Sequence, residues 1–363
     1  MRTLRTYILQ EHASPFFVTM GGLTAVLLIG NIIKFTDLVI SKGVSFFDVL
    51  RLILYLIPYM LSFTVPMACL IAMVLAFGRL STDYELIAMR ASGVAPIRLV
   101  SPMVLVGLVI SASLFLINDR LVPASHIAFR RQLKAIGVSR PTAYIEAGTF
   151  IKEFSPYVMF VYAVEGQKLD NVRIYEPQPN GPTRTIVANR GEFEPLPDRR
   201  GVTLKLYDGT MDEWDLQHPG QFYKVTFTTY SMVLRTEPEG PAKMRKKLKE
   251  QTFKELAAER RRLQAQGVDA LPASLELHRK IAASFAPIVF VLFGLAFGLR
   301  LHHHERLITF MWVLTVFVVY YLGTVGMNAI ALKDWLAPWL AMWVPNLIGT
   351  VVSAGLVAQA IRR

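Results

Sequence analysis

The sequence predicts an α-helical membrane protein with six transmembrane helices and an all-β, jelly-roll-like domain inserted between helices 3 and 4. Three observations lead to this fold class. The 363-residue chain is 53% hydrophobic and only 18% charged, below the quarter of charged residues typical of a soluble domain. Its apolar residues are gathered into six long runs. The residues between the third and fourth runs have the mixed composition of a water-facing domain.

Six runs contain no Asp, Glu, Lys, Arg or His, and each is long enough to cross a bilayer as a helix. Six buried helices without any polar face would be unusual in a soluble protein. The formal charge of +12 by itself fits nucleic acid or anionic lipid, and the apolar runs favour a membrane and argue against nucleic acid. The runs are Pro15–Ile33, Leu52–Phe77, Leu99–Asn118, Ile281–Leu299, Leu307–Leu332 and Leu336–Ile361.

The basic residues of the short connections predict the orientation. Six spans place both termini on one side, and the positive-inside rule assigns the more basic side to the cytoplasm. We therefore expect cytoplasmic termini and an extracytoplasmic insert. The terminal side has nine basic residues, and the other side has four. The nine are Arg2, Arg5, Arg79, Arg90, Arg98, Arg300, Arg306, Arg362 and Arg363, and the four are Lys34, Lys42, Arg51 and Lys333.

The spans divide the chain into three parts, 1–118 with spans 1 to 3, the insert 119–280, and 281–363 with spans 4 to 6. Residues 119–139 are expected to continue the third span as a helix. Short alternating segments rich in β-branched and aromatic residues, separated by Pro and Gly turns, predict a small β domain over about residues 143–235. Lys243–Gln266 has the pattern of a polar, basic helix ended by Gly267.

Signatures of catalysis and metal binding are absent from the sequence. It has no Gly-Lys dipeptide, hence no Walker A loop, and its single cysteine, Cys69, lies inside the second run. His302–His304 form a His-rich tract without a thiolate or carboxylate constellation, whereas a structural metal site usually needs four ligands. We expect no catalytic residue, no metal site and no cofactor in this chain. Since the runs contain no Asp, Glu, Lys or Arg, an ion-driven carrier is disfavoured, and any energy for transport would come from a partner.

The segment between the second and third runs is the best candidate for receiving that energy. Thr82 and Glu85 have the spacing of a capping box, and Gly93 is a suitable helix stop. The sequence thus predicts a short cytoplasmic helix over about 82–93, where Glu85, Leu86, Met89 and Arg90 could contact a soluble partner. A helix resting on lipid headgroups would show the same amphipathicity, and both interpretations stay open.

Three blocks of sequence resemble the lipopolysaccharide-export permeases of the LptF/LptG (YjgP/YjgQ) family. They are Ile32–Phe35 with Ser41–Gly43, the cytoplasmic block Gly78–Gly93, and the closing Trp339–Asn346. The layout of three spans, a soluble domain and three spans is similar over essentially the whole chain. Features of both the F-type and the G-type paralogue are present, so the subtype stays open.

The resemblance implies a fold and a function. The insert would be a periplasmic β-jelly roll, and this permease would pair with its paralogue in a Gram-negative inner membrane. Two copies of a cytoplasmic ATPase, binding ATP and Mg, would dock on the short helices, with Glu85 transmitting their stroke. Lys34 and Lys42 would attract lipid A phosphates, and Phe317 and Tyr320 would line the acyl-chain cavity. The lipid would pass to a membrane-anchored periplasmic jelly-roll bridge.

Two other functions compete with this hypothesis. A permease of another ABC lipid or lipoprotein exporter would share the ATPase but not the substrate contacts. A membrane-anchored assembly scaffold would need neither an ATPase partner nor contacts with a lipid substrate. For the two lysines, ordinary interfacial anchoring by snorkelling is the alternative role.

Overall fold

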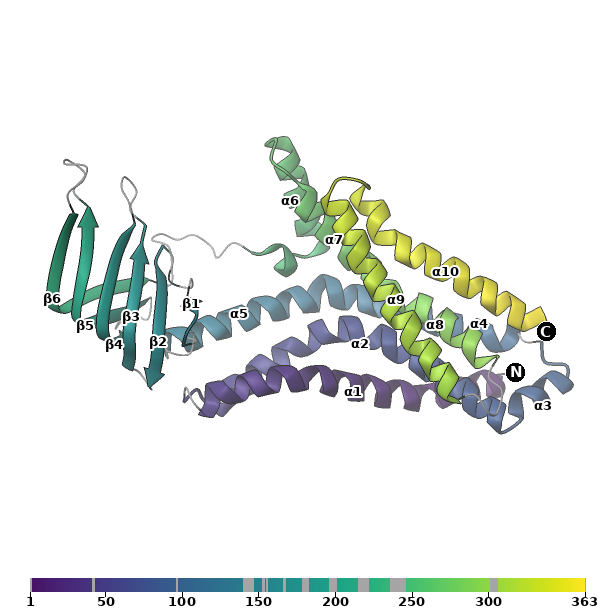
Figure 1. Ribbon diagram of the computed structural model, residues 1–363. Coiled ribbons are helices and arrows are strands. Elements are labelled where there is room, and N and C mark those ends of the chain that lie inside the picture. Colours follow the sequence, from purple (N-terminus) through teal and green to yellow (C-terminus); the bar gives the residue numbers. More distant parts are fainter. Residues whose placement is uncertain are drawn as a thin grey trace. The chain divides into compact units, whose positions relative to one another are not determined.

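The fold is described from a computed structural model of the chain (Figure 1). The structure describes residues 2–40, 43–95, 97–139, 147–151, 154, 156–165, 168–177, 183–195, 201–214, 222–235, 246–300 and 306–362. Six helical stretches in this part of the chain are long and apolar enough to cross a membrane, as the sequence predicts. They cover Leu4–Ile40, Phe46–Thr82, Ile97–Ile136, Leu271–Gly298, Met311–Leu332 and Pro338–Arg362.

Several spans are built from more than one helical element. The third runs through α4, a π-helical turn η1 and α5 without a break, which confirms the predicted helical continuation into the insert. The elements are α1 (Arg2–Ile40), α2 (Phe46–Thr82), α3 (Glu85–Ala91), α4 (Ile97–Leu116), η1 (Ile117–Leu121), α5 (Val122–Ser139), a 3-10 turn η3 (Leu248–Glu250), α6 (Phe253–Ala265), α7 (Leu271–Ser284), α8 (Ala286–Gly298), α9 (Arg306–Leu332) and α10 (Pro338–Arg362).

The fourth span is broken between α7 and α8. Pro287 lies at the start of α8, where it cannot donate a backbone hydrogen bond and its ring crowds the preceding turn. The N–H of Ile288 is freed from the helical ladder and donates instead to Ser111 Oγ on α4, at 3.2 Å. A neighbouring span thus satisfies the polar group that the break exposes, as the interior of a bilayer requires.

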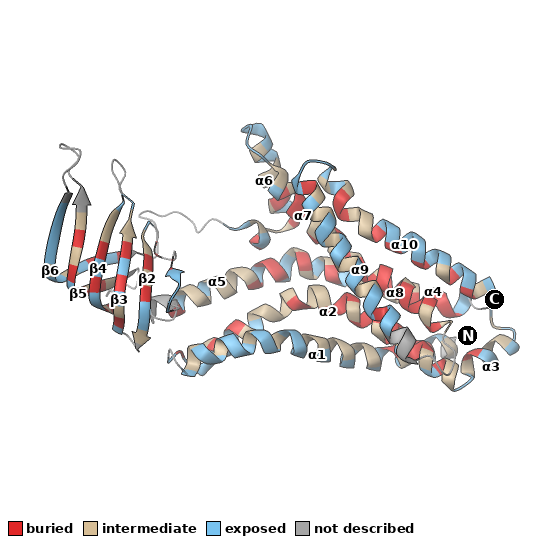
Figure 2. Cartoon of the chain, viewed as in Figure 1, coloured by how far each residue is buried: buried red, intermediate tan, exposed pale blue. Residues whose placement is uncertain are grey.

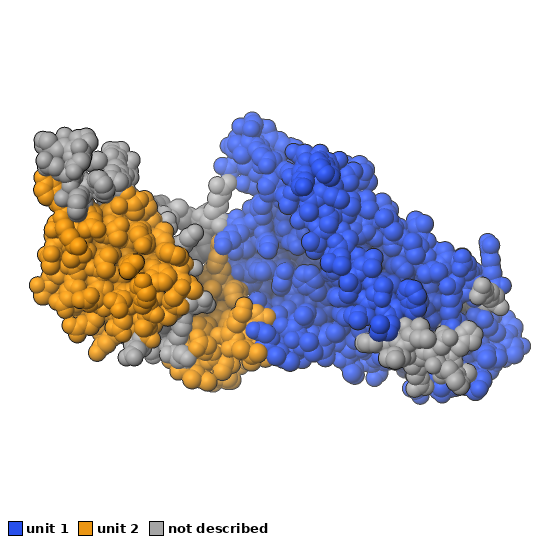
Figure 3. All heavy atoms as spheres, viewed as in Figure 1, with its two compact units in different colours: residues 1–30, 55–127, 246–363 blue, residues 31–54, 128–245 orange. Residues whose placement is uncertain are grey.

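The chain forms two compact units (Figure 3), residues 1–30, 55–127 and 246–363 in one and residues 31–54 and 128–245 in the other. In the first unit, α8 approaches α2 closely at two glycines. A Cβ atom added at Gly294 would lie 2.5 Å from the Cβ atom of Met73 on α2, and one added at Gly298 would lie 2.5 Å from the Cβ atom of Phe77. Any side chain larger than that of glycine would therefore collide with α2. Small residues allow this approach where helices associate in a membrane without a hydrophobic driving force.

Burial differs sharply between the spans (Figure 2). In their most apolar windows, 61% of α2 and 67% of the α7–α8 span are buried, against only 6% of α1 and 6% of α9. The first unit is therefore a core of well-packed spans, with two spans that expose most of their apolar surface.

The second unit contains the β domain, which confirms the predicted insert between helices 3 and 4. Its strands pair antiparallel in the order of the chain, forming one six-stranded meander. They are β1 (Phe150–Ile151), β2 (Val158–Glu165), β3 (Lys168–Glu176), β4 (Arg184–Pro195), β5 (Gly201–Trp214) and β6 (Phe222–Arg235). Beside them in this unit, Val44, Val49, Leu52 and Ile136 form a small apolar cluster at the ends of α1, α2 and α5.

A bend crosses the sheet and explains how a single sheet buries one of its own faces. Asn171 and Asp208 have left-handed backbone, with φ of 50° and 52°. The strand registers place them on one line with Tyr162, Asn189 and Thr228, and regular pairing is interrupted along that line. Asn and Asp tolerate this conformation better than other side-chain-bearing residues. The bend lets the inner face close on itself, and core residues such as Leu169, Ile186 and Leu204 are fully buried.

The predicted helix over Lys243–Gln266 is wrong in its first part, of which residues 243–245 lie outside the described residues. The 3-10 turn η3 precedes α6, and α6 begins only at Phe253. Thr252 is the cause, because its side chain accepts the Glu255 N–H while Glu255 accepts the Thr252 N–H, a capping box that fixes the helix start. Gly267, with φ of 67°, ends the helix as predicted.

The left-handed position of Asp208 leads to a test of the bend. Asp208→Val should destabilise the β domain by about 1–2 kcal/mol relative to Asp208→Gly, because only the branched side chain is strained at positive φ. Both variants lose the same ion pair with Arg190, so Gly is the matched control. Hydrogen exchange of the β5 and β6 amides in the full-length protein should be faster in the Val variant. Equal exchange in the two variants would contradict a backbone constraint at this position.

Candidate functional site

The short helix α3 lies between the second and third spans, but it starts later than the sequence suggested. The predicted capping box of Thr82 and Glu85 is wrong. α2 extends to Thr82, whose hydroxyl donates to the Gly78 carbonyl inside that helix at 2.9 Å. Tyr84, in left-handed conformation with φ of 57°, turns the chain, and Glu85 is the first residue of α3. The continuous apolar pattern of α2 outweighs the local capping preference.

The end of α3 agrees with the prediction from Gly93. Gly93 has φ of 79° and its N–H donates to the Arg90 carbonyl at 3.0 Å, while the Val94 N–H donates to the Met89 carbonyl at 3.1 Å. These two bonds are a Schellman motif. Val94 and Met89 also pack on the same apolar cluster. The hydrogen bonds and the apolar contact together fix the direction in which α3 points.

The two faces of α3 differ in exposure. Leu86 is buried, and Met89 packs partly against the same cluster, so these two anchor α3 to the spans. Arg90 is half-buried. The outer face carries Tyr84 and Ile87, which are 61% and 59% exposed. A large aromatic and a branched aliphatic side chain in this position form an apolar surface suited to a partner.

Glu85 is directed toward α1. The Tyr7 hydroxyl lies 2.8 Å from Glu85 Oε2 and 3.0 Å from Oε1, and donates to this carboxylate. Close by, Arg79 of α2 pairs with Glu11 of α1 at 2.6 Å and with Asp83 at 3.6 Å. The first turns of α1, the end of α2 and α3 are thus joined by polar contacts in one cluster, which we call the Tyr7–Glu85 cluster.

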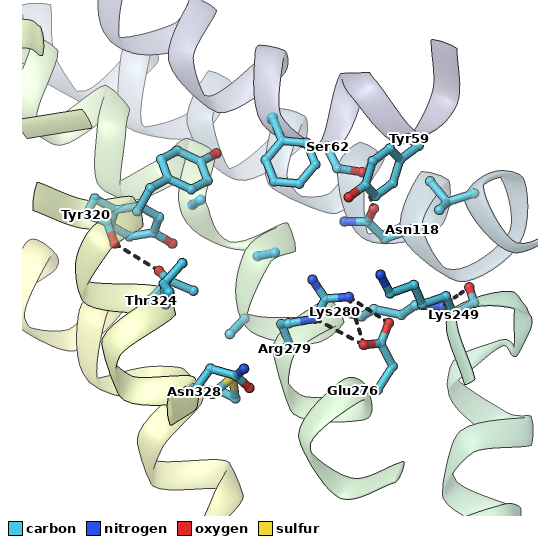
Figure 4. A pocket seen from close by; sticks show the side chains of 18 of the residues that line it. Tyr59, Ser62, Asn118, Lys249, Glu276, Arg279, Lys280, Tyr320, Thr324 and Asn328 are labelled. Atoms are coloured by element: carbon cyan, nitrogen blue, oxygen red, sulfur yellow. Dashed lines mark hydrogen bonds and ion pairs between the residues drawn. The ribbon is translucent and has the colours of Figure 1, made fainter. Parts of the chain in front are cut away.

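A cavity of about 230 Å³ lies at the opposite ends of the spans, where the chain enters and leaves the insert (Figure 4). Its lining comes from α2, η1, α5, η3, α7, α8, α9 and α10. One wall is a polar chain in which Ser62 Oγ donates to Asn118 Oδ1 at 2.6 Å and Asn118 Nδ2 donates to Ser284 Oγ at 2.9 Å. Asn118 belongs to the π-helical turn η1, and such turns are frequent at functional sites.

Charged side chains of α7 and η3 form another part of the lining. Arg279 and Glu276 make a bidentate pair with Nη2 at 2.8 Å from both carboxylate oxygens. Lys280 is only 8% exposed, and its ammonium donates to the carbonyls of Lys249 and Gln251 at 3.0 and 2.9 Å. Across the cavity lie Tyr320, Thr324 and Asn328 of α9, as Figure 4 shows.

The capping box next to this cavity carries its own charge pair. The Lys246 ammonium beside Glu255 lowers the pKa of that carboxyl, and the Thr252 N–H adds to the effect. Glu255 therefore stays ionised at neutral pH, and the loop that supplies Lys249 is held in place.

A second, larger and more apolar cavity of about 890 Å³ is lined by α8, α9 and α10. Tyr320 lines both cavities, and its hydroxyl donates to Asn346 Oδ1 at 2.7 Å. Phe317 packs against Tyr321 with ring centroids 4.6 Å apart and lines neither of these two cavities.

Of the remaining predicted residues, the structure describes Lys34. Lys34 is exposed on α1 within the second unit. Lys42 and His302–His304 lie outside the described residues. In the described part of the chain, no group of three or more His, Cys, Asp or Glu side chains could hold a metal ion.

Comparison with known proteins decides the family. The profile of the family "Lipopolysaccharide export system permease LptF/LptG" matches residues 6–359, nearly the whole chain. The chain belongs to the LptF/LptG family. The family consists of transport permeases rather than enzymes, and together with the six spans it indicates a multi-pass inner-membrane protein.

A curated relative is the "Uncharacterized protein RP871" of Rickettsia prowazekii (strain Madrid E). It is 23% identical over 236 residues, which are 65% of this chain and 64% of the relative. The chain thus covers less than two thirds of the relative's length, and the relative's name adds no activity.

The charged wall of the cavity was not predicted from the sequence, because these residues were assigned to the insert. A signal for it was nevertheless present. Glu276, Arg279 and Lys280 have i,i+3 and i,i+4 spacing directly before the uncharged run that begins at Ile281. On a helix this spacing places the three side chains on one face at the edge of a span.

The Tyr7–Glu85 cluster makes a structural prediction. Tyr7→Phe should loosen α3, since an exposed hydrogen bond to a carboxylate contributes about 1 kcal/mol. Amide exchange within Glu85–Ala91 should become about fivefold faster. Tyr55→Phe is the matched control, because the Tyr55 hydroxyl has no recorded partner in the described part of the chain. Unchanged exchange in Tyr7→Phe would show that α3 is held by Leu86 and Met89 alone.

Proposed function

We propose that this chain is the permease subunit of an ABC transporter that extracts lipopolysaccharide from the inner membrane and passes it toward the outer membrane. The family match over residues 6–359 is the observation that carries this proposal. The layout of six spans with an inserted β domain supports it. Three further assignments rest on α3, on the spans and on the sheet. They are the ATPase that drives transport (the motor), the path of the lipid, and the place where the lipid leaves the permease (the exit).

The motor is a pair of separate cytoplasmic ATPase subunits that bind ATP and Mg. The excess of basic residues at the terminal side supports cytoplasmic termini, a cytoplasmic α3 and a periplasmic β domain. Tyr84 and Ile87 offer the ATPase an exposed apolar surface. Glu85 and Arg90 flank that surface, and Glu85, which accepts hydrogen bonds from Tyr7, passes movement of α3 on to α1.

The lipid path lies where this permease pairs with its F-type or G-type paralogue. α1 and α9 have the least buried apolar windows of the six spans, 6% each, and apolar helix surface of this extent requires a lipid or protein neighbour. Two permeases joined through such spans enclose a cavity for acyl chains, with Phe317 and Tyr320 of α9 on its wall. Lys34, and Lys42 on the connection that follows, would attract the lipid A phosphates as point charges.

The exit is an edge of the β domain. In the described sheet β1 has two residues, whereas the opposite edge strand β6 has fourteen. An unpaired strand edge binds a further strand through main-chain hydrogen bonds. We therefore place the membrane-anchored periplasmic jelly-roll bridge at β6, where Tyr223, Val225 and Val233 add exposed apolar side chains.

Another ABC lipid or lipoprotein exporter, or a scaffold without transport, would share part of this architecture. Photocrosslinking to purified lipopolysaccharide separates the first from the proposed function. The rate of ATP hydrolysis by the ATPase, measured with and without the assembled permease, separates the scaffold from the proposed function. A scaffold predicts no stimulation of that rate.

The motor assignment is tested by a pull-down from detergent-solubilised membranes with mass spectrometry. Ile87→Asp should remove about half of the co-purifying ATPase or more, because it puts an unpaired charge into one of two docking surfaces. The paralogous permease should be recovered in full. Val268→Asp, an equally exposed site in the loop after α6, is the control. Full recovery of the ATPase with Ile87→Asp would overturn docking at this face of α3.

The exit assignment is tested by a photoreactive amino acid placed at Val225 on β6. It should crosslink to a separate β-domain protein when complex and bridge are reconstituted together. The same probe at Arg173, exposed on the internal strand β3, should not. Crosslinks of similar yield from both positions would show that the bridge does not recognise the β6 edge.

A further inference from the structure

We propose that the cavity lined by Lys249, Arg279 and Lys280 is an anion site that binds the phosphate of a lipid headgroup with net negative charge inside a single permease. The proposal goes beyond the proposed function, because it does not depend on which lipid the transporter exports. It rests on the geometry of the cavity and on the balance of charge within it.

The proposal depends chiefly on the environment of the Lys280 ammonium group. It is buried, and its recorded partners in the described part of the chain are two backbone carbonyl oxygens. An ammonium has three N–H donors, so one donor remains for the cavity that this side chain lines. A buried charge is costly unless an opposite charge compensates it, and the two carbonyl dipoles compensate this one only partly.

The nearby carboxylates are committed elsewhere. The Glu276 carboxylate accepts hydrogen bonds from both Nε and Nη2 of Arg279. Asp119 accepts the Phe253 N–H at 2.7 Å, Glu250 accepts the Lys247 N–H at 2.9 Å, and Glu255 pairs with Lys246. Of these four carboxylates, only Glu276 lines the cavity. The same lining contains three basic side chains, Lys249, Arg279 and Lys280. Two positive charges in the lining are therefore left without a carboxylate.

The neutral groups of the lining suit an oxyanion. Tyr59, His126 and Asn328 present a hydroxyl, an imidazole and an amide from three different helices. Donors converging from several directions match the three or four oxygens of a phosphate better than the two oxygens of a carboxylate. Charge-assisted bonds from two ammonium groups would supply most of the affinity.

The position of the cavity favours a lipid as the source of the phosphate. Asn118 ends the third uncharged run and Lys280 directly precedes the fourth, so the charged wall lies at headgroup depth. The lining continues into Phe63, Tyr321 and Val325, an apolar surface that free phosphate would not use. Basic pockets between transmembrane helices are known to hold anionic headgroups.

The test is a native mass-spectrometry titration of the full-length protein, purified with its accompanying subunits, using phosphatidylglycerol and phosphatidylcholine of identical acyl chains. Wild type should prefer phosphatidylglycerol by about tenfold, the effect of one charge-assisted interaction. Lys280→Met should abolish the preference and Lys249→Met should reduce it several-fold. Lys254→Met, which removes an exposed lysine of α6 outside the cavity, should keep it.

Two results would overturn the proposal. One is an unchanged preference in Lys249→Met, which decides the matter also if Lys280→Met fails to fold. The other is an equal loss in Lys254→Met, which would indicate general attraction to a basic surface. A separate arm measures thermal stabilisation by inorganic phosphate. Stabilisation of wild type but not of Lys249→Met, without any preference for phosphatidylglycerol, would overturn the lipid as the source.

Discussion

The lack of charge inside the spans determines where every other kind of chemistry in this protein can lie. A charged side chain at the centre of a membrane helix costs about 2.5–3.5 kcal/mol, and none of the six uncharged runs contains one. Charged side chains are therefore found at the two ends of the helices. The Tyr7–Glu85 cluster and α3 occupy one end, and the Lys280 cavity occupies the other. Among the described residues, the polar groups buried between these ends include the neutral Ser111 and Asn346.

α2 physically connects these two ends. It is continuous from Phe46 to Thr82, which at 1.5 Å per residue is about 55 Å. Tyr59 and Ser62 in the first half of α2 line the cavity, and Arg79 near its end belongs to the Tyr7–Glu85 cluster. α2 is also fixed to α8 by the close approach at Gly294 and Gly298. A force applied to α3 therefore meets a rigid α2–α8 pair, and its displacement passes more readily into α1.

The sequence predicted what depends on long patterns and missed what depends on single contacts. Runs of about twenty apolar residues and the change to alternating strands determine the six spans and the inserted sheet. The start of α3 was predicted wrongly because Thr82 is absorbed by the longer helix before it. The line of Asn171 and Asp208 across the sheet becomes visible only when strand registers are known. Likewise, the cavity needs Tyr59, Asn118, Lys280 and Asn328 together, and four spans separated in the sequence supply them.

Specific contacts also distinguish the spans that are fixed from those that can move. In a membrane, burial of apolar surface hardly favours one helix arrangement over another, so close packing and hydrogen bonds must select it. α7, α8 and α10 have such contacts, including Asn346 Nδ2 to the Ala282 carbonyl at 2.8 Å. Polar contacts that join α1 to α2 and α3 include Thr24 with Thr64, Glu11 with Arg79 and Tyr7 with Glu85. Tyr7 and Glu85 link α1 directly to α3, and both helices meet the end of α2 in the Tyr7–Glu85 cluster. A partner that shifts α3 would thereby move the span whose apolar surface is most available to a lipid.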